Sequence, residues 1–359
     1  MRRLGHDLQI IRRCGYYCTV LAEAYLHQLS PFAIELTEST GLRWYGLAYI
    51  TGFLVGWWFI RWMAKTGRSP LSSNQAGDLL FAGVLGVLFG GRIGYALFYD
   101  PELFIGFTNE FPWWDLLAIN RGGMASHGGI IGVLIAFSIW GKKHKVPVMH
   151  LADLASVGCT AGLFFGRIAN FINGELWGKK IPIQTDAPWW SVKYPTEITD
   201  VWLFNTHTYK DQLAAIEPLR TTVVGGGEKF YSRVVEEAYA GNSIVVDTIA
   251  PQLTAWYPSQ LFQAISDGPV LLISLILVWL VPRKPGVVSG WFLIMYGALR
   301  ILTEAFRQPD EGISIIFGLS RGQLLSVCMV FFGATVVLIC ARSTAKKHGG
   351  IVHTTQASA

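Results

Sequence analysis

Polar residues interrupt long apolar stretches of this sequence, and the densest set lies in the run GRIANFINGELWG at 166–178. Arg167 and Asn170 are three residues apart, so a helix would place both side chains on one face. Glu175 follows shortly after them. An arginine near the centre of a bilayer is costly and is expected to face a cavity or a partner. Because several polar groups converge, we favour an anion site over an arginine that only snorkels to the surface.

A second polar stripe occupies the apolar segment that ends near residue 306. Its members are spaced by four, four and three residues and would share one helix face; they are Tyr296, Arg300, Glu304 and Arg307. An internal ion pair that only fixes helix packing explains Glu304 as well as a functional role does. Arg300 lies deeper in the apolar segment, where a functional role is favoured.

Two further residues are candidates for chemistry. His127 lies in GGMASHGG at 122–129, at the start of an apolar segment, and imidazole is the side chain that titrates near neutral pH. A structural hydrogen bond is the alternative role for this histidine. Arg92 lies inside another apolar segment and is a candidate anion contact, whereas Tyr95 and Tyr99 are expected in an aromatic belt at the membrane surface.

These residue types predict a phosphate-binding pocket. The planar guanidinium fork of arginine matches phosphate, so Arg167, Arg300 and Arg92 are expected to bind the head group of an anionic phospholipid. No carboxylate cluster suggests a metal, and we expect no cofactor. The net charge of +5 is modest and scattered over short loops, so we expect no nucleic-acid partner. The five cysteines form no CxxC pair and are expected to be small buried residues.

The elements that carry these residues are expected to be membrane helices. Of the 359 residues, 52% are hydrophobic and 15% are charged, against about 25% charged in soluble domains. A membrane helix needs about 20 mostly apolar residues. We therefore predict an all-α integral membrane protein with about seven spans, at roughly 44–63, 78–99, 127–141, 151–173, 259–281, 287–306 and 321–341.

The loop charges predict the orientation in the membrane. Lysines and arginines follow the first, third, fifth and seventh spans, whereas the second loop is acidic. The positive-inside rule then places the C-terminus in the cytoplasm and the N-terminus outside. The four arginines among the first 13 residues oppose this, and we interpret Tyr16 to Leu29 as an amphipathic helix on the membrane surface. Glu23 and His27 interrupt that stretch and argue against a signal peptide.

The sequence predicts five consecutive segments. The segments are an N-terminal amphipathic arm (1–43), helices one to four (44–173), a small extracytoplasmic head loop (174–256), helices five to seven (257–341) and a cytoplasmic tail (342–359). The head loop is too short and irregular to predict an independent domain. Glycines four residues apart, at 86, 90 and 94 and at 158, 162 and 166, are expected to let helices approach closely.

The motifs resemble those of the bacterial prolipoprotein diacylglyceryl transferase family. The signature G-R-x-x-N-F-x-N-x-E-x-x-G is matched at every fixed position from Gly166 to Gly178. Other matching blocks follow in the family order and cover nearly all of 44–341; they are WYGLAY at 44–49, GGRIGYALFY at 90–99, GGMASHGG at 122–129, PSQL at 258–261 and YGALRILTEAFRQPD at 296–310.

The resemblance implies a reaction at the bacterial inner membrane. The sn-1,2-diacylglyceryl group of phosphatidylglycerol moves to the thiol of the lipobox cysteine of a preprolipoprotein, a thioether forms and glycerol 1-phosphate leaves. The resemblance also implies that Arg167 binds phosphatidylglycerol, that Arg300 is essential, and that the remaining family residues correspond to His127, Tyr45, Asn170 and Gly178. The family's usual His-Pro-Ser-Gln-Leu-Tyr-Glu reads Tyr257-Pro-Ser-Gln-Leu-Phe262-Gln263 here, which puts any role of those three groups in doubt.

The mechanism expected from these residues needs a base, because the thiolate rather than the thiol is the nucleophile. His127 is the first candidate base and Tyr45 the second. Arg167 and Arg300 would stabilise the charge that builds on the leaving phosphate. A transporter of an anionic lipid or solute is the alternative and predicts inverted repeats, which the sequence does not show. A scaffold whose internal charges only fix packing is a further alternative, and an intramembrane protease is disfavoured.

Overall fold

The computed structural model describes residues 24–37, 40–109, 111–182, 187–223, 228–308 and 319–352. The chain forms two compact units that interleave along the sequence. The first unit contains Met1–Ala48, Gly166–Ile265 and Leu302–Arg321, and the second contains Tyr49–Phe165, Ser266–Ile301 and Gly322–Ala359. Some membrane segments predicted from the sequence lie wholly in one unit, and others begin in one unit and end in the other.

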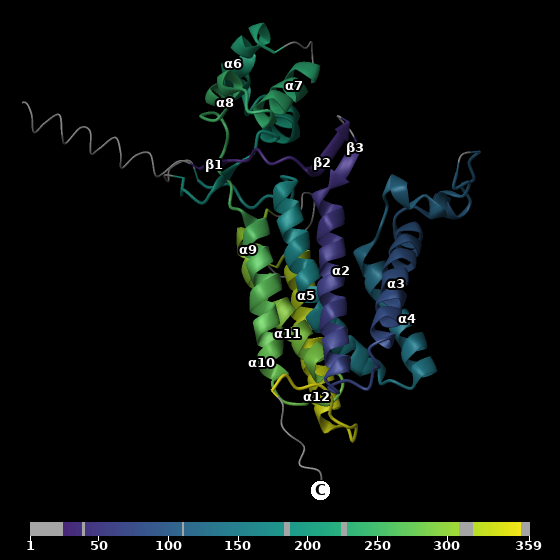
Figure 1. Cartoon of the computed structure of the whole chain (residues 1–359). Coiled ribbons are helices and arrows are strands. Elements are labelled where there is room, and N and C mark those ends of the chain that lie inside the picture. The colour runs from purple at the N-terminus through teal and green to yellow at the C-terminus, as the bar shows by residue number, and fades with distance from the viewer. Residues whose placement is uncertain are drawn as a thin grey trace, which may run out of the picture. The chain divides into compact units, whose positions relative to one another are not determined.

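The second unit is a helical bundle (Figure 1). It contains all or most of α2 (Trp44–Lys65), α3 (Gln75–Phe98), α4 (Ser126–His144), α5 (Val148–Ile172), α10 (Leu271–Val278), α11 (Val287–Thr303) and α12 (Arg321–Arg342). The start of α2, the ends of α5 and α11 and the first residue of α12 belong to the first unit. Its core gathers apolar side chains from α2, α3, α4, α5, α10 and α11, with Met63, Leu151, Leu271 and Trp279 almost wholly buried. Many other large apolar side chains face outward, as expected of helices whose surroundings are lipid.

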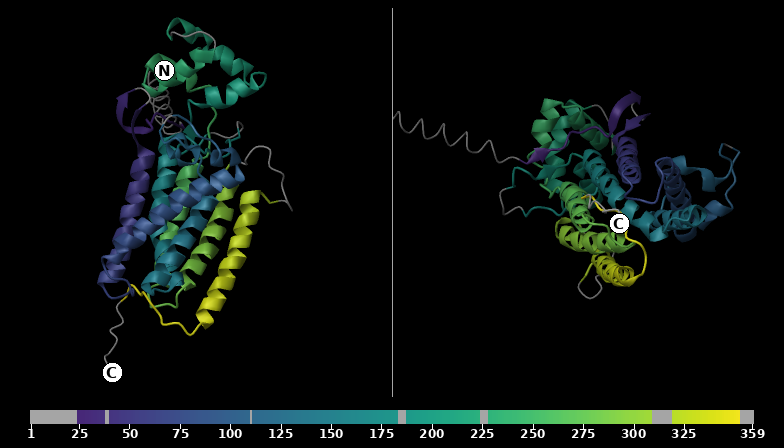
Figure 2. Two further views of the ribbon diagram at one scale, coloured as in Figure 1. Left: turned by 90° about the vertical axis from the view of Figure 1, so that its right-hand side faces the viewer. Right: turned by 60° about the horizontal axis from the view of Figure 1, so that its bottom comes forward.

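Helices α3 and α4 lie side by side and meet through glycines (Figures 1 and 2). A Cβ atom added to Gly94 would come within 2.7 Å of the Gly128 Cα atom, and one added to Gly86 within 2.7 Å of the Gly132 carbonyl oxygen. Glycine is therefore required by the close approach of the two backbones. The predicted packing stripe on α3 is confirmed.

The stripe on α5 is confirmed for part of its length. Gly158 packs against Gly56, and a Cβ atom on Gly52 would lie 2.7 Å from the Gly162 Cα atom. No described atom lies within 4 Å of a Cβ atom added to Gly166. Close helix packing therefore explains glycine at Gly158 and at the partner position Gly52, whereas a Cβ atom added to Gly162, like one added to Gly166, would meet no described atom within 4 Å.

Six helices of the described residues are long and apolar enough to cross a membrane. They are Trp44–Lys65, Gln75–Phe98, Val148–Ile172, Ser259–Val278, Val287–Phe306 and Gly322–Arg342, which agree with six of the predicted spans. The remaining prediction, 127–141, is the 19-residue helix α4. The protein is thus a mostly helical membrane protein, as the sequence predicts.

The span at Ser259–Val278 is not a regular helix. Helix α9 (Ser259–Ile265) passes into a π-helical segment, η7 (Ser266–Val270), before α10 begins. Pro269 lies inside η7, and the side chain of Asp267 is fully buried there. Its Oδ1 accepts a hydrogen bond from Ser266 Oγ at 3.1 Å. The π-helical turn is the local rearrangement that lets a proline and a buried carboxyl group occur within one span.

In the first unit, the segment predicted as an irregular head loop has its own apolar core. Helices α6 (Lys210–Ile216), α7 (Glu228–Tyr239) and α8 (Ser243–Ile249) enclose it. Trp202, Phe230, Val234, Val245 and Ile249 are buried in that core. The head is therefore a small packed subdomain and not an irregular loop.

Short strands add to the first unit. Strand β1 (Tyr25–Leu26) pairs in parallel with β4 (Val192–Lys193), and β2 (Phe32–Thr37) pairs antiparallel with β3 (Thr40–Arg43) in a hairpin that leads into α2. The amphipathic helix predicted over 16–29 does not include residues 24–29, which contain β1 and no helix. Residues 1–23 of the predicted arm, with Cys14 and Cys18, lie outside the described part of the chain.

The side chain of His27 anchors this non-helical segment. Its side chain is fully buried, and its ring nitrogens lie 2.8 Å from the Phe171 carbonyl oxygen and 3.2 Å from the Tyr239 hydroxyl group. Burial lowers the pKa of His27, and the bond to the Phe171 carbonyl opposes that shift. The histidine that interrupted the apolar stretch therefore joins the N-terminal segment to the end of α5 and to the head.

Candidate active site

Three predicted site residues meet in the first unit. Tyr45, in the first turn of α2, donates a hydrogen bond to Glu175 Oε1 at 2.7 Å. Asn170, in the last turn of α5, donates to the same carboxylate oxygen at 2.8 Å and also to the Tyr45 hydroxyl oxygen. The carboxylate, the phenol and the amide thus form a closed polar cluster, which we call the Tyr45–Asn170–Glu175 cluster. Asn170 is buried and the other two side chains are half-buried.

The turn after α5 positions Glu175 in this cluster. Gly174 and Leu176 both have positive φ angles, +63° and +57°, which reverse the chain on either side of the glutamate. The PSQL block holds this turn from outside. Gln260 Nε2 donates to the Glu175 carbonyl oxygen at 2.6 Å, and Ser259 Oγ donates to that of Leu176 at 3.0 Å. The sequence alone indicates no role for this block.

An aromatic pair supports the same turn. Trp177 stacks on Tyr194 with ring centroids 4.8 Å apart, and its indole nitrogen donates to the Gly174 carbonyl oxygen at 2.7 Å. Burial raises the pKa of the Tyr194 hydroxyl group, which receives a 3.3 Å hydrogen bond from Gln260. The turn is therefore held by hydrogen bonds from an amide, a hydroxyl group and an indole.

Gly178 has a steric role in this unit. It forms an antiparallel bridge with Arg307, and its N–H group donates to the Tyr257 carbonyl oxygen at 3.1 Å. A Cβ atom on Gly178 would lie 2.7 Å from the Phe306 carbonyl oxygen and closer still to that of Tyr257. Glycine is therefore needed because three backbone segments converge here. The bridge between Gly178 and Arg307 joins the end of the signature to the last residue of the polar stripe.

Arg167 and the end of the polar stripe also belong to the first unit. Arg167 lies on α5, half-buried, one turn before Asn170 on the same helix face. Arg307 Nη1 lies 3.9 Å from Glu304 Oε2, and Ser320 Oγ donates to the other oxygen of Glu304 at 3.1 Å. Glu304 therefore takes part in an ion pair, which is the packing role expected for it as an alternative to function.

The other predicted site residues belong to the second unit. His127 is exposed in the first turn of α4, and Arg300 is half-buried on α11. Tyr296, one turn before Arg300, stacks on Phe292 with centroids 5.6 Å apart. The structure brings Tyr45, Asn170 and Glu175 into contact in the first unit. His127, Tyr296 and Arg300 belong to the second unit.

The side chain of Arg92 forms hydrogen bonds with backbone carbonyl groups. Its buried guanidinium group donates to the carbonyl oxygens of Leu116, at 2.9 Å, and Gly123, at 3.0 Å, and also to those of Asp115 and Gly122. It therefore fixes the loop that leads to the first turn of α4. A contact between Arg92 and a lipid phosphate stays a prediction, and this geometry gives the residue a structural role that the sequence did not reveal.

The departures from the family motif form an aromatic cluster in the first unit. Tyr257 contacts Trp190 and Phe306 with centroid distances of 5.7 and 5.5 Å, and Phe262 contacts the same two rings at 5.9 and 5.2 Å. Gln263 is buried. Tyr257 and Phe262, which stand where the family usually has histidine and tyrosine, thus belong to an aromatic cluster beside Gly178.

Two features were missed in the sequence. Asp267, in the buried π-helical segment, could have been found as the one acidic residue of its apolar stretch, followed by Gly-Pro. Asp153 on α5 accepts hydrogen bonds from the backbone N–H groups of Gly286 and Ser289, at 2.8 and 2.7 Å, at the start of α11. No group of three or more metal-ligating residues gathers anywhere in the described ranges.

Comparison with known proteins identifies the family of this chain. A family model described as prolipoprotein diacylglyceryl transferase matches residues 31–339. A protein of Bdellovibrio bacteriovorus named phosphatidylglycerol–prolipoprotein diacylglyceryl transferase is 39% identical over 347 residues, covering 90% of this chain and 96% of its own length. Proteins of the same name from Photobacterium profundum and Rhodospirillum rubrum are 36% and 34% identical, covering 90% and 89% of this chain and 95% and 92% of their own. The chain therefore belongs to the prolipoprotein diacylglyceryl transferase family.

Proposed function

We propose that this protein transfers the sn-1,2-diacylglyceryl group of phosphatidylglycerol to the cysteine thiol of a preprolipoprotein lipobox, the first step of bacterial lipoprotein maturation. The observation that carries the proposal is the Tyr45–Asn170–Glu175 cluster at the end of a membrane-spanning helix, one turn from Arg167. Membership of the family and the names of the relatives agree with this reaction.

In this proposal the arginines bind the phosphate of phosphatidylglycerol. Arg167 and Arg300 contribute the guanidinium forks that match its oxygens. Asn170 and Glu175 hold the glycerol head group or orient Arg167, and Gly178 keeps the turn in place. Arg92 shapes the loop before α4 and is the third candidate for the anion. Tyr296, Glu304 and Arg307 support the arginine on α11.

The reaction then requires one proton transfer and one displacement. His127 takes the proton from the acceptor thiol, with Tyr45 as the second candidate base. The thiolate attacks the glyceryl carbon that bears the phosphate ester, so that a C–S bond forms and the C–O bond to phosphate breaks. The electron pair of that bond leaves with glycerol 1-phosphate, and Arg167 and Arg300 stabilise the developing charge. The chain needs no nucleophile of its own, because the acceptor supplies the thiol.

We further propose that α4 is a seventh membrane helix and that the protein is a multi-pass protein of the bacterial inner membrane. Its 19 residues reach about 29 Å at the helical rise of 1.5 Å per residue, enough for the apolar core of a bilayer. The positive-inside rule places the C-terminus in the cytoplasm and the head with α6 to α8 on the outer side.

The test uses purified protein, phosphatidylglycerol and a synthetic lipobox peptide. We expect the peptide to gain the mass of one diacylglyceryl group while glycerol 1-phosphate is released. A peptide with serine in place of cysteine, and phosphatidylethanolamine as donor, are the controls and should give no product. A protein that binds phosphatidylglycerol and yet leaves the cysteine peptide unmodified would contradict the proposal and favour the transporter.

A further inference from the structure

A basic pocket lies at the opposite end of the second unit from α4's first turn, outside the residues used above. It has a volume of about 610 Å³, within the ~300–1,000 Å³ of ordinary small-molecule sites. Three segments form it: the turn after α2 (66–70), the turn after α10 (281–283) and the C-terminal tail (346–352). The charged residues of its lining are all basic. They are Arg68, Arg283, Lys346 and Lys347, joined by His348.

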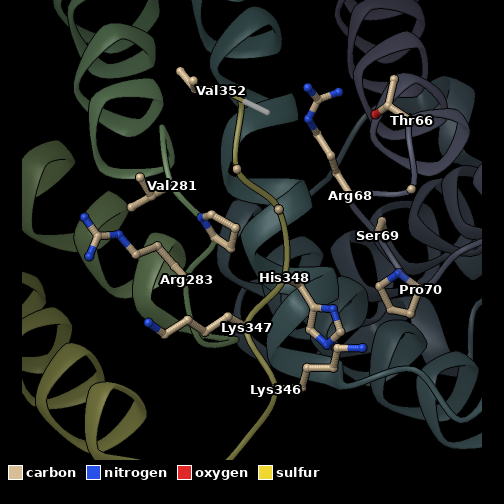
Figure 3. A pocket seen from close by; sticks show the side chains of 14 residues that line it. Thr66, Arg68, Ser69, Pro70, Val281, Arg283, Lys346, Lys347, His348 and Val352 are labelled. Carbon is tan, nitrogen blue, oxygen red and sulfur yellow. The ribbon is translucent and has the colours of Figure 1, made fainter. Parts of the chain in front are cut away.

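The tail is built into this pocket. The Arg283 and His348 backbones form an antiparallel bridge, with N···O distances of 3.0 and 2.8 Å. The Gly349 N–H group donates to the Arg68 carbonyl oxygen, and Arg68 Nη2 donates back to that of Ile351 at 3.1 Å. Figure 3 shows the tail with Lys347 and His348 running between Arg68 on one side and Arg283 on the other.

Two glycines allow the tail to take this path. Gly349 and Gly350 have φ angles of +84° and +89°, which favour glycine, and a Cβ atom on Gly349 would collide with the indole of Trp279. The indole nitrogen of Trp279 donates to the His348 carbonyl oxygen at 3.1 Å. The positive-inside rule requires only that lysines follow a span. It does not require that they be fixed around a cavity, so orientation alone does not explain this arrangement.

Some basic groups at this end already have structural partners. Lys65 and Arg342 lie in the last turns of α2 and α12, where cations offset the partial negative charge of the helix end. Lys284 Nζ donates to the Ala341 carbonyl oxygen at 3.1 Å. Lys346 and Lys347, by contrast, form no hydrogen bond or ion pair with any residue in the described ranges. Their charge is in excess of what the helix ends use.

We propose that this pocket binds a phosphate group, and that its carrier is the head group of an anionic phospholipid. The pocket lies where α2, α10 and α12 end, and the ends of membrane-spanning helices are where lipid head groups are expected. Val281, Pro282 and Val352 supply apolar lining beside the cations. Each cation near an anionic membrane surface adds to the attraction, and fixed cations around a cavity convert that attraction into a site. A soluble phosphate ester shares the chemistry and is separated by the experiment.

The experiment measures hydrogen–deuterium exchange of the amides of 346–352 in full-length protein. The protein is placed in nanodiscs of phosphatidylcholine, with or without phosphatidylglycerol, and separately in phosphatidylcholine with millimolar inorganic phosphate. The pocket variant is Lys346→Gln with Lys347→Gln. The matched control is Lys142→Gln with Lys143→Gln, which removes two exposed lysines from the same end of the bundle at the last turn of α4, outside the pocket.

We expect phosphatidylglycerol to slow exchange about five-fold in the wild-type protein and in the control variant, and to have no effect on the pocket variant. Slowing by inorganic phosphate but not by phosphatidylglycerol would overturn the lipid as carrier. Equal slowing in both variants would show a diffuse surface effect and overturn the site, as would no slowing at all. Because exchange is measured rather than transfer, failure here is distinct from failure of the proposed reaction.

Discussion

The Tyr45–Asn170–Glu175 cluster gives the sharpest prediction, through the substitution Glu175→Gln. The carboxylate oxygen Oε1 accepts two hydrogen bonds, at 2.7 Å from Tyr45 and 2.8 Å from Asn170. Hydrogen bonds to a charged acceptor contribute about 1.5–3 kcal/mol, and neutral ones about 0.5–1.5 kcal/mol. Glutamine keeps the shape but not the charge, so the cluster loses about 1 kcal/mol for each bond, or about 2 kcal/mol in all.

That loss has a defined effect if the cluster holds the head group for reaction. Since about 1.4 kcal/mol corresponds to a factor of ten in rate, kcat/KM for diacylglyceryl transfer should fall about 30-fold. The assay is peptide modification at a range of phosphatidylglycerol concentrations, normalised to folded protein. A double-mutant cycle with Tyr45→Phe should give a coupling of about 1 kcal/mol, because the two substitutions remove the same hydrogen bond.

A matched carboxylate elsewhere in the first unit provides the control. Glu197 is buried and accepts two hydrogen bonds on Oε2, from the Thr254 N–H group at 2.9 Å and the Trp256 indole at 3.2 Å. Glu197→Gln should lower the stability of the unit by a similar amount and leave kcat/KM of the folded protein unchanged. If Glu175→Gln behaved in the same way, with stability lost and kcat/KM kept, the cluster would be structural only and the reasoning would be refuted.

Three further predictions concern single residues. Gly178→Ala should lower stability by about 1–3 kcal/mol in thermal unfolding, because its Cβ atom meets backbone, whereas Gly166→Ala should have little effect, and equal shifts would contradict the packing argument. Burial lowers the pKa of His27 below its ordinary value of 6.5, so as the pH falls through 6.5 the unfolded chain binds a proton that the folded chain does not. Stability of the head should therefore decrease on acidification below that pH, by less in His27→Gln, and parallel pH curves for the two proteins would exclude this cause. His127→Ala should reduce kcat by about 10²–10⁴ if it is the base, while His144→Ala, at the other end of α4, should not; full activity of the first variant would remove His127 from the mechanism.

The membrane helices could be predicted because length and hydropathy act locally. Six of the predicted spans correspond to helices that qualify by length and composition. The short third span could not be delimited, because α4 begins in a glycine-rich stretch whose helix is fixed by close contact of Gly128 with Gly94. The head core was not predicted, since Trp202 and Phe230 come from short segments that show no long apolar period.

The contacts of the Tyr45–Asn170–Glu175 cluster could be predicted in part. Asn170 and Glu175 lie five residues apart, so their contact follows from one turn at a helix end. Tyr45 joins them from 125 residues away, and only the family block suggested it. The role of Arg92 could not be read from the sequence, because its partners are backbone carbonyl groups that any residue offers. The π-helical turn around Asp267 leaves no clear hydrophobic period, although an acidic residue followed by Gly-Pro in an apolar stretch marks its place in the sequence.

The most direct test of the proposed reaction compares wild-type protein with Arg167→Ala in the transfer assay. The measured quantity is the fraction of lipobox peptide that gains a diacylglyceryl group in a fixed time, with folding of both proteins checked by thermal unfolding. We predict rapid modification by the wild-type protein and a loss of at least about 100-fold in the variant, because one phosphate contact in a water-poor site is removed. Wild-type activity in a folded Arg167→Ala protein would contradict the claim that Arg167 binds the phosphate.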